Sequence, residues 1–301
     1  MKPLIQCIPN FSEGKDPQIV KAIKTSIKNY TGVHVANIQM DSDHNRSVIT
    51  FLGGAEAVSN GAYEGCRKAQ ELIDLREQTG VHPRIGATDI IPIVPLWGYS
   101  IRACVNMAHR LGKAIYRDLK IPVYFYDYAA LRPKRKELPK IRKGEFESLK
   151  KKIAYDSYFY PDEGTNKIHL SAGAVAIGVR DVLVAFNINL GTTDIKIGRK
   201  IANRIREKNN GLPGVRALGL FLPQRQQVQI SMNLTNYKKT NMVEAFRAVT
   251  TLSQSFNVEV LDSELVGLAP KEAMGKASPK DLRMKQIDSS QFLEDHTQFF
   301  S

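Results

Sequence analysis

The sequence of 301 residues has few cysteines and no long apolar stretch. Its three cysteines, Cys7, Cys66 and Cys104, are odd in number, far apart and without the spacing of a metal site. Reduced thiols in a cytoplasmic protein are the simplest interpretation. No run approaches the roughly 18 apolar residues of a membrane-spanning helix, and the N-terminus is too mixed in character for a secretory signal. These absences predict a cytoplasmic protein with no metal and no membrane partner.

The motifs of common nucleotide enzymes and hydrolases are also missing. No Gly-x-Gly-x-x-Gly follows the first predicted strand, no phosphate-binding loop occurs, and no Gly-x-Ser-x-Gly elbow is present. Positive charge is in excess, at +13, and residues 132–152 hold ten Lys or Arg against three Glu. A solvated helix face, a nucleic-acid contact and a field that attracts a polyanionic small molecule are all open for this segment. Because it lacks a groove-reading motif, we expect no nucleic-acid partner.

Hydrophobic periodicity predicts alternating strands and helices, with a restart in the middle of the chain. The first half follows the order β-α-β-β-α-β-α-β, with Asp16-Pro17 and Ser100 as helix starts. The second half follows the order β-α-β-β-α-β. The expected strands are 4–9, 33–39, 47–52, 90–95, 121–126, 182–190, 215–222, 226–234 and 258–261, and the expected helices are 17–29, 55–75, 101–119, 144–153, 194–208 and 240–256.

Paired neighbouring strands in such units favour antiparallel or mixed sheets with helices on one face. We therefore predict an α/β (α+β) protein of two subdomains, residues 1–178 and 179–301. Each is expected to be a mixed βαββαβ-like sheet with helices on its outer face. The other sheet faces are then left to pack against each other.

One loop concentrates the features of a catalytic site. Residues 79–89 read Thr-Gly-Val-His-Pro-Arg-Ile-Gly-Ala-Thr-Asp and run directly into the strand 90–95. Pro83 biases His82 toward extended backbone, and Gly80 and Gly86 allow an irregular path. Histidine titrates near neutral pH, and loops held by rigid strands commonly carry catalytic groups. A catalytic His82 and a histidine that caps a nearby backbone group are both open on local chemistry.

Further polar clusters lie at the ends of predicted strands. Residues 10–14 form either a ligand contact or a hydrogen-bonded turn. Residues 41–46 contain two Asp, a His, an Asn and an Arg, but their spacing matches no metal motif, and a hydrogen-bonded connection or an orienting partner for another histidine is favoured. Residues 167–174 suit either a flat ligand or tight sheet packing. Asn187 and Asn189 share one strand face, which indicates a ligand or a buried network.

Six blocks of the sequence resemble a single family. In order along the chain they are Cys-Ile-Pro-Asn-Phe-Ser-Glu-Gly (7–14), Asp-His-Asn-Arg-Ser-Val (43–48), His-Pro-Arg-Ile-Gly-Ala-Thr-Asp (82–89), Arg-Lys-Gly-Glu-Phe-Glu (142–147), Ala-Phe-Asn-Ile-Asn-Leu (185–190) and Ser-Glu-Leu-Val-Gly-Leu-Ala-Pro (263–270). Together they resemble the glutamate formiminotransferase family, folate-dependent transferases that in animals are fused to a cyclodeaminase.

The resemblance implies a reaction and a set of residues. The formimino group of N-formimino-L-glutamate would pass to nitrogen-5 of tetrahydrofolate, releasing L-glutamate in histidine degradation. A homodimer with a ligand tunnel between two facing sheets is also implied. The family's catalytic histidine falls on His82, which would act as general base. Its folate-contacting segment falls on Gly164, Thr165, Asn166, Lys167, Ile168, His169, Leu170, Ser171, Ala172 and Gly173.

Both ligands carry carboxylates, which basic and amide side chains would bind. Arg46, Arg84 and the basic segment 132–152 are candidates, because arginine pairs with carboxylates through two parallel hydrogen bonds. Asn10, Asn187 and Asn189 are further candidates for substrate binding.

Three positions depart from the family's pattern. Asn37 and Gln39 stand where family members carry Asp, and Val81 replaces the Glu of a Gly-Glu-His-Pro-Arg motif. A carboxylate that orients the ring of His82 would then come from Asp41, Asp43 or Asp89, or be lost. A 5-formyltetrahydrofolate–glutamate formyltransferase and a non-catalytic folate-binding relative are the alternatives to the formimino transfer.

Overall fold

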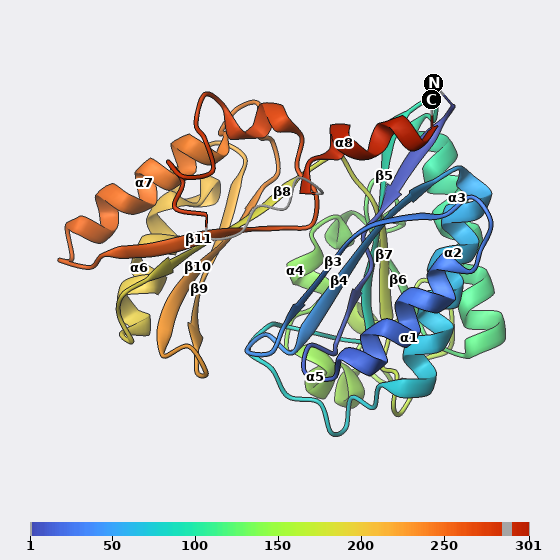
Figure 1. Ribbon diagram of the computed structural model, residues 1–301. Coiled ribbons are helices and arrows are strands. Elements are labelled where there is room, and N and C mark those ends of the chain that lie inside the picture. Colours follow the sequence, from blue (N-terminus) through green and yellow to red (C-terminus); the bar gives the residue numbers. More distant parts are fainter. Residues whose placement is uncertain (1, 285–290, 301) are drawn as a thin grey trace. The chain divides into compact units, whose positions relative to one another are not determined.

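The computed structural model describes residues 2–284 and 291–300, which form two compact units (Figure 1). The first contains the chain up to Asp181 together with Phe300, and the second contains the described residues from Val182 to Phe299. The predicted boundary after residue 178 falls inside the last strand of the first unit. No described helix is both long and apolar enough to cross a membrane. The expectation that the two sheets face each other stays a prediction.

The first unit is built on a mixed sheet of seven strands. Strands β1 and β2 lie end to end between β4 and β5, so they form one strand path interrupted at Ile8 and Pro9. The β5–β7 and β6–β7 pairs are parallel and the other pairs are antiparallel, as the prediction of a mixed sheet requires. The strands are β1 (Leu4–Cys7), β2 (Asn10–Phe11), β3 (His34–Asp41), β4 (Arg46–Gly53), β5 (Thr88–Trp97), β6 (Val123–Asp127) and β7 (Val175–Val179).

Three long helices pack on one face of this sheet: α1 (Pro17–Lys28), α2 (Ala55–Leu72) and α3 (Ile101–Leu119) (Figure 1). The predicted caps are present, since Asp16 Oδ1 accepts the Gln18 N–H at 2.7 Å and Ser100 Oγ accepts the Ala103 N–H at 3.1 Å. Apolar side chains from these helices and from alternate strand positions form one buried core, which includes Ile23, Ile27, Phe51, Ile91, Met107, Leu111 and Phe125.

Two shorter helices, α4 (Leu138–Ile141) and α5 (Glu145–Lys152), cover part of the opposite face (Figure 1). Tyr124 and Tyr126 point to this side and pack with Ile141 and Leu149, whereas Phe125 between them belongs to the larger core. The predicted sheet with helices on one face is confirmed for the first unit. In addition, the basic segment folds back over the opposite face through its apolar residues.

Two strands, β2 and β7, escape the sequence prediction. Strand β7 lies between β5 and β6 and is buried on both faces, so its residues show no alternation of apolar and polar side chains. Strand β2 has only two residues and lies in a segment predicted as a polar turn. Such short segments become strands through their neighbours, and periodicity does not reveal them.

The second unit is a four-stranded sheet in the order β11-β8-β10-β9. All three strand pairs are antiparallel, so the predicted mixed sheet is wrong for this unit, although its β-α-β-β-α-β order is confirmed. Residues such as Phe186, Ile188, Ile230 and Val249 form its own core. Its elements are β8 (Val184–Leu190), α6 (Ile195–Ile205), β9 (Val215–Leu222), β10 (Gln227–Leu234), α7 (Met242–Gln254), β11 (Val260–Val266) and α8 (Leu293–Thr297). Short 3₁₀ helices occupy Pro133–Arg135, Ser157–Phe159, Glu207–Asn209, Lys271–Met274 and Gln298–Phe300.

Candidate active site

A β-bulge at the start of β5 directs the side chain of Asp89. Asn10 of β2 pairs with Ile90, but the next residue, Phe11, pairs with Thr88. One residue of β5, Asp89, is therefore extra in the register. Bulges of this kind turn a side chain away from its regular direction and occur beside active sites. Here the bulge directs the carboxylate of Asp89 toward two arginines.

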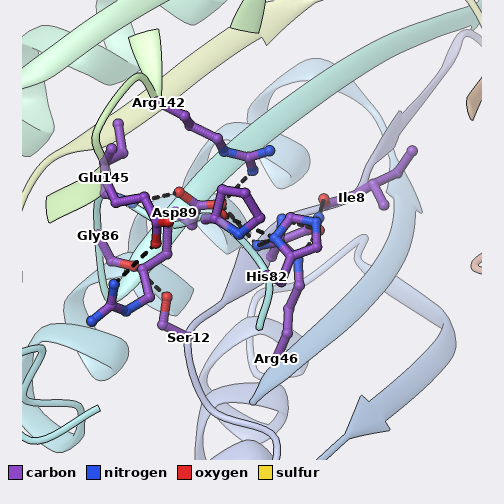
Figure 2. A network of polar contacts seen from close by, with 12 residues as sticks. Ile8, Ser12, Arg46, His82, Gly86, Asp89, Arg142 and Glu145 are labelled. Atoms are coloured by element: carbon purple, nitrogen blue, oxygen red, sulfur yellow. Dashed lines mark hydrogen bonds and ion pairs between the residues drawn. The ribbon is translucent and has the colours of Figure 1, made fainter. Parts of the chain in front are cut away.

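The buried carboxylate of Asp89 is the centre of the polar network in Figure 2. Its Oδ1 accepts the Ile85 N–H at 2.9 Å. Its Oδ2 accepts from Arg46 Nη1 at 2.9 Å and from Arg142 Nη2. Burial alone would raise the pKa of Asp89, but the guanidiniums of Arg142 and Arg46 outweigh it, so the pKa lies below its ordinary value. Asp89 is therefore an anion that ties three segments of the chain together.

Arg46, the first residue of β4, uses every nitrogen of its guanidinium. Nε and Nη2 donate to Asn10 Oδ1 at 2.9 and 2.6 Å, and the Asn10 amide is itself oriented because it donates to the Ile8 carbonyl at 2.7 Å. Nη1 donates to Asp89 and also lies 3.1 Å from His82 Nδ1. Burial lowers the pKa of Arg46 to about 10, although Asp89 opposes the shift. Arg46 thus stays cationic at neutral pH.

His82 has a guanidinium and a carbonyl beside Nδ1, rather than a carboxylate. Nδ1 lies 3.1 Å from Arg46 Nη1 and 2.9 Å from the Pro83 oxygen. A guanidinium only donates and a carbonyl only accepts, so each contact selects a different tautomer of the neutral ring. Burial, followed by the charges of Arg46 and Arg142 and by His44, lowers the pKa of His82 well below its ordinary value of 6.5. The ring is therefore uncharged at neutral pH.

The carboxylate partner considered for His82 is absent among the described residues. Asp89 is separated from the ring by Arg46 (Figure 2), and Asp41 accepts the His44 N–H at 2.8 Å. The His44 ring instead lies beside that of His82, with 5.7 Å between centroids. The departures at Asn37, Gln39 and Val81 thus coincide with a site in which arginine contacts the histidine.

The connection 41–46 also holds the backbone of the His82 loop. Val81 N–H donates to the Asp43 carbonyl at 3.2 Å, and Asn45 Nδ2 donates to the Thr79 carbonyl at 2.9 Å. A Cβ on Gly80 would lie 2.3 Å from the His44 carbonyl oxygen, so only glycine permits this approach. The cluster 41–46 is a hydrogen-bonded connection, the interpretation favoured from its spacing.

The predicted folate segment 164–173 adjoins the same loop at its C-terminal end. Ala87 N–H donates to the Ala172 carbonyl and Ala174 N–H donates to the Ile85 carbonyl, each at 2.9 Å. Gly86 and Gly173 meet in a backbone bridge, where a Cβ on Gly86 would lie 1.9 Å from the Ala174 oxygen. Ser12 Oγ donates to the Gly86 carbonyl at 2.7 Å (Figure 2). Two segments distant in sequence are thus fixed to each other through backbone.

The rest of segment 164–173 mainly satisfies its own backbone. His169 Nδ1 accepts the Ala172 N–H at 3.1 Å, and Lys167 N–H donates to the Thr165 carbonyl at 2.7 Å. Leu170, in contrast, is 62% exposed. The segment's assignment to folate stays a prediction.

Arg84 points to α5 rather than to His82. Its Nη2 donates to the Gln78 carbonyl at 2.7 Å and to Glu147 Oε1 at 2.9 Å. Its Nη1 lies 3.3 Å from carboxylate oxygens of both Glu145 and Glu147. The terminal nitrogens are therefore engaged within the first unit, and binding of a substrate carboxylate by Arg84 stays a prediction.

Asn187 and Asn189 belong to a polar ladder on one face of the second sheet. Asn187 Nδ2 donates to Glu264 Oε1 at 2.9 Å, and Asn189 Nδ2 donates to Asp262 Oδ1 at 2.6 Å. Gln229 Nε2 connects these two pairs, because it donates to Asn189 Oδ1 and to Glu264 Oε1, each at 3.0 Å. The amides form a hydrogen-bonded network, and a ligand role for them stays a prediction.

Sequence reasoning did not single out Arg142, which the structure brings to Asp89 across 53 positions of the chain. The available signal was its place at the head of the Arg-Lys-Gly-Glu-Phe-Glu block, inside the basic segment. Within the described residues, no group of three His, Cys, Asp or Glu could hold a metal ion.

The fold and this network define an α/β protein with a largely buried cluster of two arginines, a carboxylate and a histidine. Comparison with known sequences then specifies it: the chain belongs to the formiminotransferase family. Residues 4–180 match the formiminotransferase domain, N-terminal subdomain, and residues 185–296 match the formiminotransferase domain. The resemblance carried by the six sequence blocks is confirmed.

Curated relatives match along nearly the whole chain. A glutamate formimidoyltransferase of Thermoplasma acidophilum is 42% identical over 293 residues, which cover 97% of this chain and 96% of that protein. A glutamate formimidoyltransferase of Streptococcus pyogenes serotype M1 is 37% identical over 297 residues, covering 98% and 99%. The formimidoyltransferase-cyclodeaminase of Rattus norvegicus is 37% identical over 280 residues, covering 91% of this chain and 51% of the rat protein.

Proposed function

We propose that this chain transfers the formimino group of N-formimino-L-glutamate to nitrogen-5 of tetrahydrofolate and releases L-glutamate, with His82 moving the proton. The observation that carries the proposal is the placement of His82, whose Nδ1 lies 3.1 Å from Arg46 Nη1 and 2.9 Å from the Pro83 oxygen, where burial and the neighbouring charges lower its pKa. A general base must have a free lone pair at the working pH. The names of the full-length relatives support the reaction class.

The residues of the site fit the proton transfers that this reaction needs. Tetrahydrofolate supplies a secondary amine, whose proton must leave as nitrogen-5 bonds to the formimino carbon. His82 accepts this proton at Nε2 when its Nδ1–H donates to the Pro83 carbonyl. The resulting imidazolium lies beside Arg46 and Arg142, so it readily gives the proton to the departing nitrogen of glutamate. The proton gained in the first half is thus lost in the second, and His82 returns to its starting state.

The expected contributions differ in size. Proton transfer by a positioned histidine accounts for about 10²- to 10⁴-fold in rate. Holding donor and acceptor together contributes as much or more. The backbone pairing of residues 85–87 with 172–174 supports a folate contact at 164–173, because it anchors that segment to the loop that carries His82. The exposed Leu170 would offer an apolar surface to a flat ring. The homodimer implied by the resemblance and the cytoplasmic location predicted from composition are carried over as parts of the proposal.

The test is an assay of the purified chain with tetrahydrofolate and N-formimino-L-glutamate. We expect 5-formiminotetrahydrofolate to form, and His82→Ala to reduce turnover at least 100-fold, in line with the contribution of a general base. His109→Asn is the matched control, since His109 also contacts a backbone carbonyl, that of Ala129 at 2.9 Å, but lies on α3.

Three results would contradict the proposal in different ways. Turnover that survives His82→Ala would exclude the base. Turnover only with 5-formyltetrahydrofolate and glutamate would favour the formyltransferase. Binding of tetrahydrofolate without turnover of either donor would favour the non-catalytic relative.

A further inference from the structure

Two largely buried arginines beside His82, Arg46 and Arg142, share one carboxylate. Arg46 and Arg142 have side chains only 9% and 13% exposed, and they share a single carboxylate, that of the fully buried Asp89. His82 adds no charge. The acidic side chains of Glu145 and Glu147 are already engaged by Arg84. Two cations and one anion therefore remain, and an uncompensated buried charge is costly.

Of Arg46, Arg84 and Arg142, only Arg142 has a terminal nitrogen without a hydrogen-bond partner among the residues that the structure describes. Every nitrogen of Arg46 is hydrogen-bonded, and both terminal nitrogens of Arg84 are engaged. Arg142 is bonded to Asp89 through Nη2. Its Nε is enclosed without an acceptor, whereas its Nη1 has no hydrogen-bond partner among the described residues and its side chain is 13% exposed. The missing anion would therefore bind at Arg142.

We propose that Arg142 binds a carboxylate of the formimino donor through Nη1, beside His82. This inference rests on the proposed function, which supplies a glutamyl substrate with two carboxylates. A carboxylate here would bring the cluster to two cations and two anions. Hydrogen bonds between guanidinium and carboxylate are also among the strongest in proteins. Arg46, whose donors are all used, is a positioning residue that holds Asp89, Asn10 and His82.

Binding at Arg142 would also strengthen the base at the moment it is needed. The charged or titratable groups that face His82 are Arg46 from β4, Arg142 after α4, and His44 from the connection 41–46, all of which disfavour the imidazolium. Asp89 on β5 and Tyr126 on β6 face the two arginines. A substrate carboxylate on Arg142 would offset the positive charge and so favour proton acceptance by His82.

Two measurements test this inference, one with ligand alone and one during turnover. The first is calorimetric binding of glutarate, which has both carboxylates and no transferable group. The second is the KM for N-formimino-L-glutamate. Arg142→Gln is expected to weaken glutarate binding and raise this KM by about 10- to 100-fold, the loss typical of one charge-assisted hydrogen bond. The KM for tetrahydrofolate should stay near that of the wild type. Arg110→Gln on the exposed surface of α3 is the control for loss of one arginine charge.

The pH profile separates binding from a purely structural role of Arg142. In the wild type, the acidic limb of kcat, which reports the substrate complex, should lie at higher pH than that of kcat/KM, which reports the free enzyme. Arg142→Gln should bring the two limbs together. If that variant does not fold, Arg142→Lys keeps the charge toward Asp89 while removing the branched donor, and the same weakening of glutarate binding is expected.

The outcomes distinguish this inference from the proposed function. Arg142 variants that bind glutarate and N-formimino-L-glutamate as tightly as Arg110→Gln would overturn the inference, even if the wild type turns over normally. Glutarate binding that depends on Arg142, in a protein without transferase activity, would support the anion site and sink the proposed function. A wild type that does not bind glutarate would overturn the inference.

Discussion

The Nη1 of Arg46 lies 3.1 Å from the Nδ1 of His82. A carboxylate at this place would stabilise the imidazolium, whereas a guanidinium opposes it. His82, the proposed base, is consequently a weak base in the free protein, and its conjugate acid is strong. In a reaction that removes a proton from one nitrogen and returns one to another, such a histidine favours rapid return of the proton.

Arg46 is expected to affect activity in two separable ways, through its positive charge and through the hydrogen bonds that position His82. Arg46→Gln removes the charge next to His82, so the acidic limb of kcat/KM should move to higher pH. Arg46→Lys keeps the charge but cannot reach Asn10, Asp89 and His82 together, so activity should fall about 10-fold or more, as for the loss of a charge-assisted hydrogen bond, with the limb near its original pH. Steady-state rates from pH 5 to 9 measure both effects. Equal limbs in all three proteins would refute the electrostatic role.

The depressed pKa of His82 makes stability depend on pH with a defined sign. Below pH 6.5, the ordinary value, the unfolded chain protonates residue 82 while the folded chain does not. The unfolded state then binds more protons, so stability falls as pH falls, by up to about 1.4 kcal/mol per pH unit. His82→Gln should remove this part of the slope in urea unfolding between pH 7.5 and 5.5. A slope steeper than that of the wild type would contradict the prediction.

Asp89→Asn should be strongly destabilising. It leaves Arg46 and Arg142 buried without their shared anion, a change that costs about 3–5 kcal/mol. Asp74→Asn is the matched control, because Asp74 pairs with Arg76, whose side chain is 58% exposed, and loss of a surface pair costs within about 1 kcal/mol. Denaturant unfolding at pH 7 compares the two. Similar losses in both variants would show that the Asp89 network is not a stabilising element.

The close approach of the two loops should not tolerate a side chain at residue 86. A Cβ there would lie 1.9 Å from the Ala174 carbonyl oxygen, so the backbone must move, at a cost of about 1–3 kcal/mol for overpacking. We expect Gly86→Ala to lower kcat as well, since the shift propagates to His82. Gly54→Ala, whose Cβ would be 3.6 Å from the nearest atom, should remain near wild type in both measurements. Wild-type kcat in Gly86→Ala would refute the link between this contact and the base.

The sequence predicts the long helices well because each has one buried and one exposed face. Helices α1 and α3 begin at the predicted caps, and β9 has the predicted bounds. Strand β7 lacks that asymmetry and was missed. The antiparallel pairing of the second sheet and the cover of α4 and α5 over the first depend on contacts between segments that a one-dimensional pattern does not contain.

The site was predictable only in part for a related reason. His82 is marked by its own loop, with a proline and two glycines close by. The partners of that histidine depend on a bulge at Asp89 and on an ion pair that joins residues 89 and 142. Nothing in the local sequence gives the direction of Arg84, which points to α5 instead. The sequence identifies the candidate side chains, but it does not indicate the direction in which they point.

The parallel neighbours β6 and β7 are joined by an excursion that carries Arg142 and the segment 164–173. The histidine and Arg46 lie outside it, on segments fixed by the sheet. The residues proposed for recognition and those proposed for proton transfer thus lie on separate stretches of the chain, and the excursion starts and ends on adjacent strands. Replacing this excursion with that of a relative is therefore expected to change which donor is accepted. The residues proposed for proton transfer would stay the same.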